Sequence, residues 1–396
     1  MKSRQIPLSR VILIVFITIL LTVQATWAVG FIMRRNDENR LRAELSDLFM
    51  LAEILDILEE HSIHEINRSE LVGLLADEIF TRIGDRSYGG FLTSEQYQAR
   101  LDARTGTHVG IGVTVQHHPH SIEILDVSTN SPAANSGLRV GDLITSIENR
   151  TVEGMANSER VALIRGEEGT YVNLTLDRGG ETINARVRRA RLQLAPPIVY
   201  SLAPDGITGI IRIRTFGDDR VRTQFNDALE YLTNSGAEQF IFDVRGNGGG
   251  SVGNVVAILR QLLPAGRIIT LNYGNGTSQT HYVESDSGFD APIVVLTDEN
   301  SASASELFVA ALRDNNIGTF IGTTTFGKGS VQRYFRLSNG SAIRTTVGMF
   351  YPPSGINFDG VGIIPDIEVQ REGNINFNEI NFEYDNQLII ALEYFR

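Results

Sequence analysis

The chain has 396 residues, of which 42% are hydrophobic and 21% are charged, so it is long enough for two or three globular domains. Its net charge of −12 argues against a nucleic-acid-binding protein, because such proteins need a basic face. Cysteine is absent, which excludes disulfides, thiolate nucleophiles and cysteine metal sites.

An apolar run near the N-terminus predicts a membrane segment. Residues 11–33 form a stretch of 23 residues without charge, preceded by three basic residues. A helix needs about 20 apolar residues to cross the core of a bilayer. We therefore expect residues 1–35 to be a cytoplasmic tail and a membrane anchor. The protein would then be a single-pass protein of the cell envelope, with its catalytic part in the periplasm or outside the cell. A signal peptide cleaved near Ala28 is the alternative.

Residues 36–105 are predicted to be a helical region. A second helix is expected between Ser69, as N-cap, and Gly84, followed by a glycine-rich turn and a short helix. Such helices serve ordinary packing, and a helical hairpin this early in the chain also suits dimerisation. The first helix of this region is expected before Ser69. It has one apolar face, built from leucines at steps of three and four: Leu41, Leu45, Leu48, Leu51, Leu55 and Leu58.

The next segment, residues 106–190, is rich in predicted strands. The stretch "HVGIGVTVQ" at 108–116 alternates as a strand does, and "SPAANSGLRVGDLITSI" at 131–147 is typical of a helix, a turn and a strand. Residues 117–120, "HHPH", are interpreted as a surface turn, because no carboxylate spacing suitable for a metal site accompanies them.

Strands and helices alternate in residues 191–396, after a proline-bearing joint at 194–206, which indicates an α/β domain. A β-rich part follows at 331–355. The predicted strands lie at 207–216, 239–245, 291–298 and 319–325, and the predicted helices at 218–236, 251–263 and 304–316.

Two loops follow predicted core strands, at the sheet edge where sites gather in open α/β folds. The first, "DVRGNGGGSV" at 243–252, has glycine N–H groups that suit an oxyanion, and it lacks the lysine of a phosphate-binding loop. The second, "TDENSASASEL" at 297–307, places Ser303 before a helix, next to the unpaired N–H of Ala304. Helix capping is the ordinary role of such a serine.

A base for this serine must come from elsewhere in the chain. Of seven histidines only His281 falls in the α/β part, so few histidines are available there for a Ser-His-Asp triad. Lys328, in "TFGKGSVQ", could serve if burial lowers its pKa from about 10.4. Phe326 and Val331 would wall such a pocket, and in an extended chain Gln332 lies on the same face as Lys328 and can orient its amine. An isolated lysine in a glycine turn would simply be a surface residue.

In combination, these motifs resemble the C-terminal processing peptidases, or tail-specific proteases. The matching stretches are "DVRGNGGG", "ENSASASELFVAALRDN", "TFGKGSVQ" and "GVGIIPDIEV". The family consists of serine endopeptidases with a Ser-Lys dyad. The resemblance therefore implies that Ser303 is the nucleophile and that Lys328, 25 residues later, is the base. It further implies that Gln332 orients the lysine. The oxyanion hole would consist of the N–H of Ala304 and the N–H of one glycine in the 248–250 loop, of which we favour Gly249. The glycine loop reads N-G-G-G where many relatives have N-P-G-G, which keeps the donors.

The strand-rich segment resembles a PDZ domain, which binds a peptide as an extra strand and holds its C-terminal carboxylate on backbone N–H groups. By this resemblance Gly110, Ile111, Gly112 and Val113 form the peptide-binding loop, and Arg165 couples the PDZ domain to the active site.

The fold implied by the resemblance is a multidomain α/β protein. Residues 191–396 would form a crotonase-like α/β protease core, to which residues 36–105 contribute, with a PDZ domain inserted at 106–190, an N-terminal helical segment and a β-rich C-terminal part.

The resemblance implies an endopeptidase that captures the C-terminal tails of proteins and cleaves them, without cofactor or metal. An adaptor protein, homo-oligomerisation through the N- or C-terminal regions and membrane attachment through the N-terminal helix are further expectations; nucleic acid is not an expected partner. The alternatives are a catalytically silent PDZ scaffold that binds protein C-termini and a Ser-Lys amidase acting on small amides.

Overall fold

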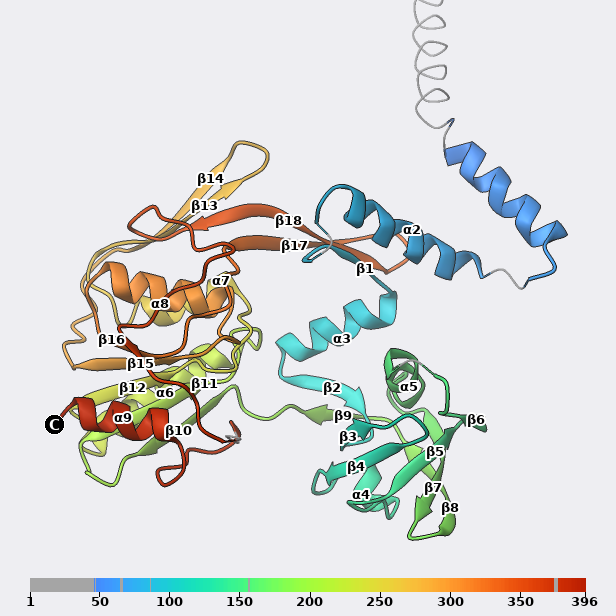
Figure 1. The fold of residues 1–396 in the computed structure, drawn as a ribbon, viewed down its shortest axis with the longest axis horizontal. Helices are drawn as coiled ribbons and strands as arrows, with labels where there is room; N and C mark the ends of the chain where they lie inside the picture. The colour runs from blue at the N-terminus through green and yellow to red at the C-terminus, as the bar shows by residue number, and fades with distance from the viewer. Residues whose placement is uncertain (1–45, 47, 65–66, 86, 156, 374–376) are drawn as a thin grey trace, which may run out of the picture. The chain divides into compact units, whose positions relative to one another are not determined.

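The computed structural model describes residues 46 and 48–396, except 65–66, 86, 156 and 374–376 (Figure 1). The chain divides into two compact units, Met1–Leu75 and Ala76–Arg396. The predicted membrane segment at 11–33 lies outside the described residues. None of the helices in the described ranges has the length and apolar character needed to cross a bilayer.

The N-terminal helices expose much apolar surface. Residues 48–61 are helical, and α2 covers Arg68–Arg82. The helix at 48–61 carries large apolar side chains that are at least 40% exposed: Leu48, Phe49, Met50, Ile54, Ile57 and Leu58. The expected short helix is present as α3 (Ser94–Arg104), which begins with a capping box between Thr93 and Gln96.

Most strands between residues 107 and 193 belong to one antiparallel sheet with the order β3-β4-β5-β7-β8, and β6 is paired to β5. The predicted strand at 108–116 is interrupted: Gly112 has a φ of 87°, and β2 and β3 lie on either side of the break. The elements are β2 (Thr107–Gly110), β3 (Val113–His117), β4 (Ile122–Val127), α4 (Pro132–Asn135), β5 (Leu143–Ile147), β6 (Arg150–Thr151), α5 (Asn157–Ile164), β7 (Tyr171–Arg178), β8 (Glu181–Arg188) and β9 (Ala190–Gln193).

A six-stranded sheet forms the centre of the C-terminal part, in the order β10-β11-β12-β15-β16-β19. All neighbours are parallel except β10 and β11. This confirms the alternating pattern expected from the sequence. The strands are β10 (Ile198–Leu202), β11 (Thr208–Ile213), β12 (Gln239–Asp243), β15 (Ile293–Thr297), β16 (Thr319–Gly322) and β19 (Ile367–Glu368).

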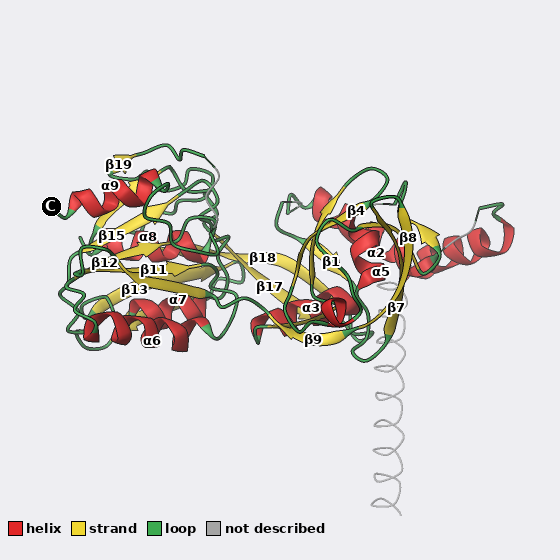
Figure 2. Cartoon of the chain, turned by 90° about the horizontal axis from the view of Figure 1, so that it is seen from below, coloured by secondary structure: helices red, strands yellow, loops and turns green. Residues whose placement is uncertain are grey.

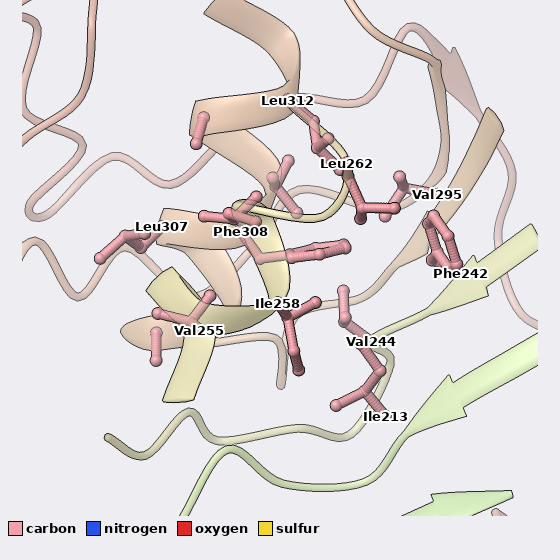
Figure 3. Close-up of a cluster of buried hydrophobic side chains, with 14 of the residues drawn as sticks. Ile213, Phe242, Val244, Val255, Ile258, Leu262, Val295, Leu307, Phe308 and Leu312 are labelled. Atoms are coloured by element: carbon pink, nitrogen blue, oxygen red, sulfur yellow. The ribbon is translucent and has the colours of Figure 1, made fainter. Parts of the chain in front are cut away.

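Helices cover both faces of this sheet, which explains why its strands are apolar on both sides. On one face α6 (Val221–Asn234), α7 (Val252–Leu259) and α8 (Ala304–Asp314) share a core with β11, β12 and β15. Figure 3 shows this core, where Phe308 and Leu312 of α8 lie against Phe242 and Val295 of the sheet. On the other face α9 (Asn386–Tyr394) packs on Ile241 and Val294. This packing fixes the position of α8 on the sheet, and with it the position of the helix N-terminus.

A second sheet has the order β1-β18-β13-β14, with β17 paired to β18. Figure 2 shows β17 and β18 as a long antiparallel pair. The turn end of this hairpin contacts β1 and α3: Leu92 of β1 is paired with Ala342, and Tyr97 of α3 stacks on Tyr334. The sheet contains β1 (Gly90–Leu92), β13 (Gly266–Tyr273), β14 (Ser278–Val283), β17 (Ser330–Arg336) and β18 (Ala342–Tyr351).

Candidate active site

Ser303 stands at a strained turn between β15 and α8. Its backbone has a φ of 58° and a ψ of −113°, a region that a serine rarely adopts. The residue is 9% exposed, and α8 begins with the next residue. The nucleophile of α/β-hydrolases likewise has a strained backbone just before a helix. The strain therefore favours a reactive role for Ser303 over simple helix capping.

The glycine loop lies directly against this turn. A Cβ built on Gly249, which has a φ of 96°, would lie 2.9 Å from both Ala304 N and Ser303 Cβ. Ser301 and Ser305 bind the same loop, because their hydroxyl groups donate to the carbonyl oxygens of Val244 and Asn247 respectively. The structure thus places Gly249 next to Ser303 and Ala304.

The N–H of Gly249 has a partner within its own loop: it donates to Oδ1 of Asn247 at 2.9 Å. Binding of an oxyanion by this N–H would require that hydrogen bond to be shared or released. The N–H of Ala304 lies at the start of α8, where the helix itself supplies no acceptor.

A buried carboxylate joins the two loops that carry Ser303 and Lys328. Oε2 of Glu306 accepts from the backbone N–H of Ser303 and from that of Lys328, each at 2.8 Å. Oε1 accepts from the Thr325 hydroxyl and the Gly327 N–H, both at 2.6 Å. Glu306 is fully buried, so these four donors replace its hydration. The sequence shows only a serine and a glutamate at capping-box spacing; the contacts with residues 325–328 are tertiary.

Lys328 is half-buried, and this burial lowers the pKa of its amine. The charges of Arg344 and Arg100 lower it further, whereas Glu306 and Asp359 act in the opposite direction. A lowered pKa is what a lysine needs in order to act as a base.

The amine of Lys328 does not hydrogen-bond to the Ser303 hydroxyl in this conformation. Nζ lies 4.5 Å from the centre of the Tyr88 ring, a cation–π contact. Tyr88 belongs to the glycine-rich turn before β1, and nothing in its local sequence indicates this contact. Phe326, which the sequence suggested as a pocket wall, is 57% exposed, whereas Val331 is buried as expected.

Gln332 lies in β17, and its side chain amide donates to the Ser330 hydroxyl at 3.0 Å and to Thr346 Oγ1 at 3.5 Å. No hydrogen bond links it to Lys328, although both residues are described. The orienting role expected for Gln332 would require its side chain to turn away from these partners.

An ion cluster with fully buried side chains supports the base of the glycine loop. Asp243, at the end of β12, accepts from Arg212 at 2.7 Å and from Arg245 at 2.7 Å. Arg245 also donates to Asp385, the N-cap of α9, at 2.6 Å. Burial alone would raise the pKa of Asp243, but Arg245 and Arg212 together hold it below its usual range. The loop is therefore fixed at its root to the strands and to α9.

The expected peptide-binding loop connects β2 to β3. The carbonyl oxygen of Ile111 accepts from Ala133 N at 2.8 Å, and that of Gly112 accepts from Ser128 N at 2.9 Å. Gly110 ends β2 and Val113 begins β3. Because β3 ends the strand order of its sheet, its outer edge can accept an additional strand.

Arg165 is exposed after α5 and lies near His108. Burial lowers the pKa of His108, and the charge of Arg165 adds to this effect. Two of the three histidines of "HHPH" face a carboxylate: His118 pairs with Glu123 at 2.9 Å and His120 with Glu153 at 2.8 Å. His117 ends β3, and burial together with the charge of Arg160 lowers its pKa.

Comparison with known proteins gives two family matches. Residues 207–369 match the model of peptidase family S41, and residues 109–188 match that of the PDZ domain. The S41 match contains the six-stranded sheet from β11 onward, the glycine loop, Ser303 and Lys328.

Two proteases are similar in sequence over most of this chain. The chain is 32% identical over 323 residues to the carboxyl-terminal-processing protease of a Synechocystis strain, covering 80% of this chain and 73% of that protein. It is 31% identical over 288 residues to the carboxy-terminal processing protease CtpA of Bacillus subtilis, covering 72% of this chain and 61% of that relative.

Among solved structures, the photosystem II D1 C-terminal processing protease aligns with a TM-score of 0.48 and 24% identity, over 81% of this chain and 86% of that chain. On the strength of the two family matches and of the 32% identity to the Synechocystis protease, the chain belongs to peptidase family S41, as a serine-type C-terminal processing protease that also carries a PDZ domain.

Proposed function

We propose that the protein is an endopeptidase that hydrolyses the C-terminal tails of protein substrates with Ser303 and Lys328 as its catalytic dyad. One observation carries this proposal: both residues are tied through their backbone N–H groups to the same oxygen of Glu306. The backbone of a strained serine and that of a lysine with a lowered pKa are thereby held close to one another. The crotonase-like character of the core and the domain boundaries at 105/106 and 190/191 remain predictions.

The reaction follows from these groups. The Ser303 oxygen attacks the scissile carbonyl carbon while neutral Lys328 accepts the hydroxyl proton. The N–H groups of Ala304 and Gly249 stabilise the oxyanion, and Lys328 then passes the proton to the departing amine, leaving an acyl group on Ser303. Water, deprotonated by Lys328, releases the acyl group and restores the serine.

Three rearrangements precede the chemistry in this proposal. The amine of Lys328 moves from the Tyr88 ring to Ser303, and the N–H of Gly249 turns from Asn247 to the oxyanion. Gln332 turns from Ser330 toward Lys328 and orients it. Binding of a tail by the PDZ domain, transmitted through Arg165, would favour this active arrangement.

Tail capture is assigned to the loop Gly110–Val113 and to the free edge of β3. The loop would hold the C-terminal carboxylate on its N–H groups, and the tail would pair with β3 as a further strand. The edge position of β3 supports this assignment.

We further propose that residues 11–33 anchor the protein in the membrane, with the protease outside the cytoplasm. Protomers would associate through the N-terminal helices, whose exposed apolar side chains support an interface. An adaptor protein would regulate access of substrates.

The test is digestion of a protein with an unfolded C-terminal tail by the wild type, Ser303→Ala and Lys328→Ala. We expect shortened tails, identified by mass spectrometry, with the wild type alone. Ser287→Ala, an exposed serine of the same part of the chain, serves as the control and should remain active. Equal cleavage by all variants would contradict the dyad, and tail binding without cleavage by the wild type would favour the PDZ scaffold.

A further inference from the structure

A cavity of about 510 Å³ lies beside the glycine loop. Residues 194–197, which lead from β9 into the protease core, form one wall, and Gly246 of the glycine loop forms part of another. Gly249 of the same loop touches Ser303. The cavity thus lies between the segment that follows the PDZ-matched region and the loop that carries Gly249.

The wall of this cavity is basic in a protein that is acidic overall. It contains the side chains of Arg100, Arg104, Arg214 and Arg245, whereas Asp218 is its one acidic residue. The net charge of the whole chain is −12, so a cluster of four guanidinium groups is a local exception.

Two of these arginines are already neutralised by the protein. Arg245 is bound by Asp243 and Asp385, and Arg104 lies 3.2 Å from Asp219. The acidic wall residue, Asp218, is also occupied, because Arg220 binds it at 2.7 Å.

The other two have no carboxylate partner among the described residues. Arg214 donates to the carbonyl oxygen of Pro196 at 3.3 Å, and Arg100 lies over the Tyr334 ring at 4.3 Å. Burial, together with the charge of Arg212, lowers the pKa of Arg214, while no acidic group raises it. A half-buried guanidinium normally has an anionic partner, which indicates that the partner comes from outside the chain.

We propose that this cavity is a substrate subsite that binds a carboxylate side chain, aspartate or glutamate, on the C-terminal side of the scissile bond. The inference rests on the proposed function. When the PDZ loop holds the end of a tail, the residues between that end and the scissile bond pass along the segment 194–197. An acidic side chain among them meets Arg214, whose guanidinium can bind both of its oxygens in bidentate fashion, and Arg100 adds a second positive charge to the same cavity.

The test uses the full chain with Ser303→Ala and fluorescent peptides that share one C-terminal sequence. A single glutamate is moved along the peptide, and each peptide is compared with its glutamine counterpart. We expect one or two positions at which glutamate binds about ten-fold more tightly, with the preference weakening as salt rises. In Arg214→Leu the preference is lost, in Arg214→Lys part of it remains, and in Arg214→Glu it is reversed toward lysine peptides. Arg336→Leu, on the exposed far end of β17, keeps the preference.

Equal binding of glutamate and glutamine peptides at every position would overturn the subsite, as would a preference that survives Arg214→Leu. Cleavage by the wild type separates the two proposals. Equal hydrolysis of both peptides would contradict the subsite and support the protease. An Arg214-dependent binding preference without hydrolysis would support the subsite and contradict the protease.

Discussion

The backbone N–H groups of Ser303 and Lys328 donate to the same atom, Oε2 of Glu306, at 2.8 Å each. The two residues come from different loops, one before α8 and one before β17. A shared acceptor fixes the distance between the loops, and the burial of Glu306 keeps water from competing for its oxygens.

Glu306→Gln should reduce kcat/KM by about 100-fold or more, because the amide nitrogen would face N–H donors and the two loops would separate. We also expect a loss of about 1–3 kcal/mol in the free energy of unfolding, measured in urea. Glu284→Gln, at an exposed position, is the control. Retention of full activity by Glu306→Gln would show that the shared acceptor does not position the dyad.

The pH dependence of activity should follow Lys328. The base must be neutral, and burial together with Arg344 and Arg100 lowers its pKa, so activity should rise with pH at a midpoint below the usual lysine value of about 10.4. Arg344→Gln removes one of these charges and should move the midpoint to higher pH, whereas Arg336→Gln should not.

The chain makes a direct titration possible, since Lys328 is the only lysine after Lys2. The rate at which an amine-reactive reagent modifies Lys328, followed by peptide mapping across pH, reports its pKa without any substrate. A midpoint at the ordinary lysine value would contradict its assignment as the base.

Gly249→Ala should abolish most activity. The added Cβ would lie 2.6 Å from the Ala302 carbonyl oxygen and 2.9 Å from Ser303 Cβ, at a φ of 96°. We expect a loss of about 100-fold or more in kcat, the cost of disturbing one oxyanion donor. Gly276→Ala is a matched control, because Gly276 also has a positive φ, 82°, and has open space around it. Similar losses of kcat in both variants would show that backbone strain alone causes the loss.

Asp243→Asn should destabilise the protein by about 3–5 kcal/mol, because it leaves two buried guanidinium groups without their shared carboxylate. The pKa of Asp243 is lowered in the folded state. Its contribution is therefore fully present above the unfolded-state pKa of about 3.9 and declines as pH falls below that value. Urea unfolding at neutral and acidic pH should show a smaller difference between wild type and variant at the acidic end. A constant difference would mean that Asp243 is not charged in the folded protein.

The sequence predicted the central sheet well, because each strand is a short apolar run followed by an amphipathic helix. Residues 208–213, 239–243 and 293–297 are strands as expected. The hairpin β13–β14 and the helix α9 were not predicted, although "YGNGTS" is a turn signal and Asp385 precedes an apolar run.

The site could be predicted only in part. Local sequence indicates that Ser303 begins a helix, but it does not show the contacts that distinguish a nucleophile from a cap. Glu306 and Tyr88 reach Lys328 through tertiary contacts across 22 and 240 residues, which no spacing rule covers. The hydrogen bonds of Gln332 to Ser330 and Thr346 likewise depend on the pairing of β17 with β18.

The dyad is tested most directly by trapping the acyl-enzyme. Wild type is mixed with a peptide nitrophenyl ester, quenched with acid after short intervals and analysed by peptide mapping. We expect an acyl group on Ser303, none at that position in Ser303→Ala, and formation at least about 100-fold slower in Lys328→Ala. An acyl group on another residue, or equally fast acylation of Ser303 in Lys328→Ala, would contradict it.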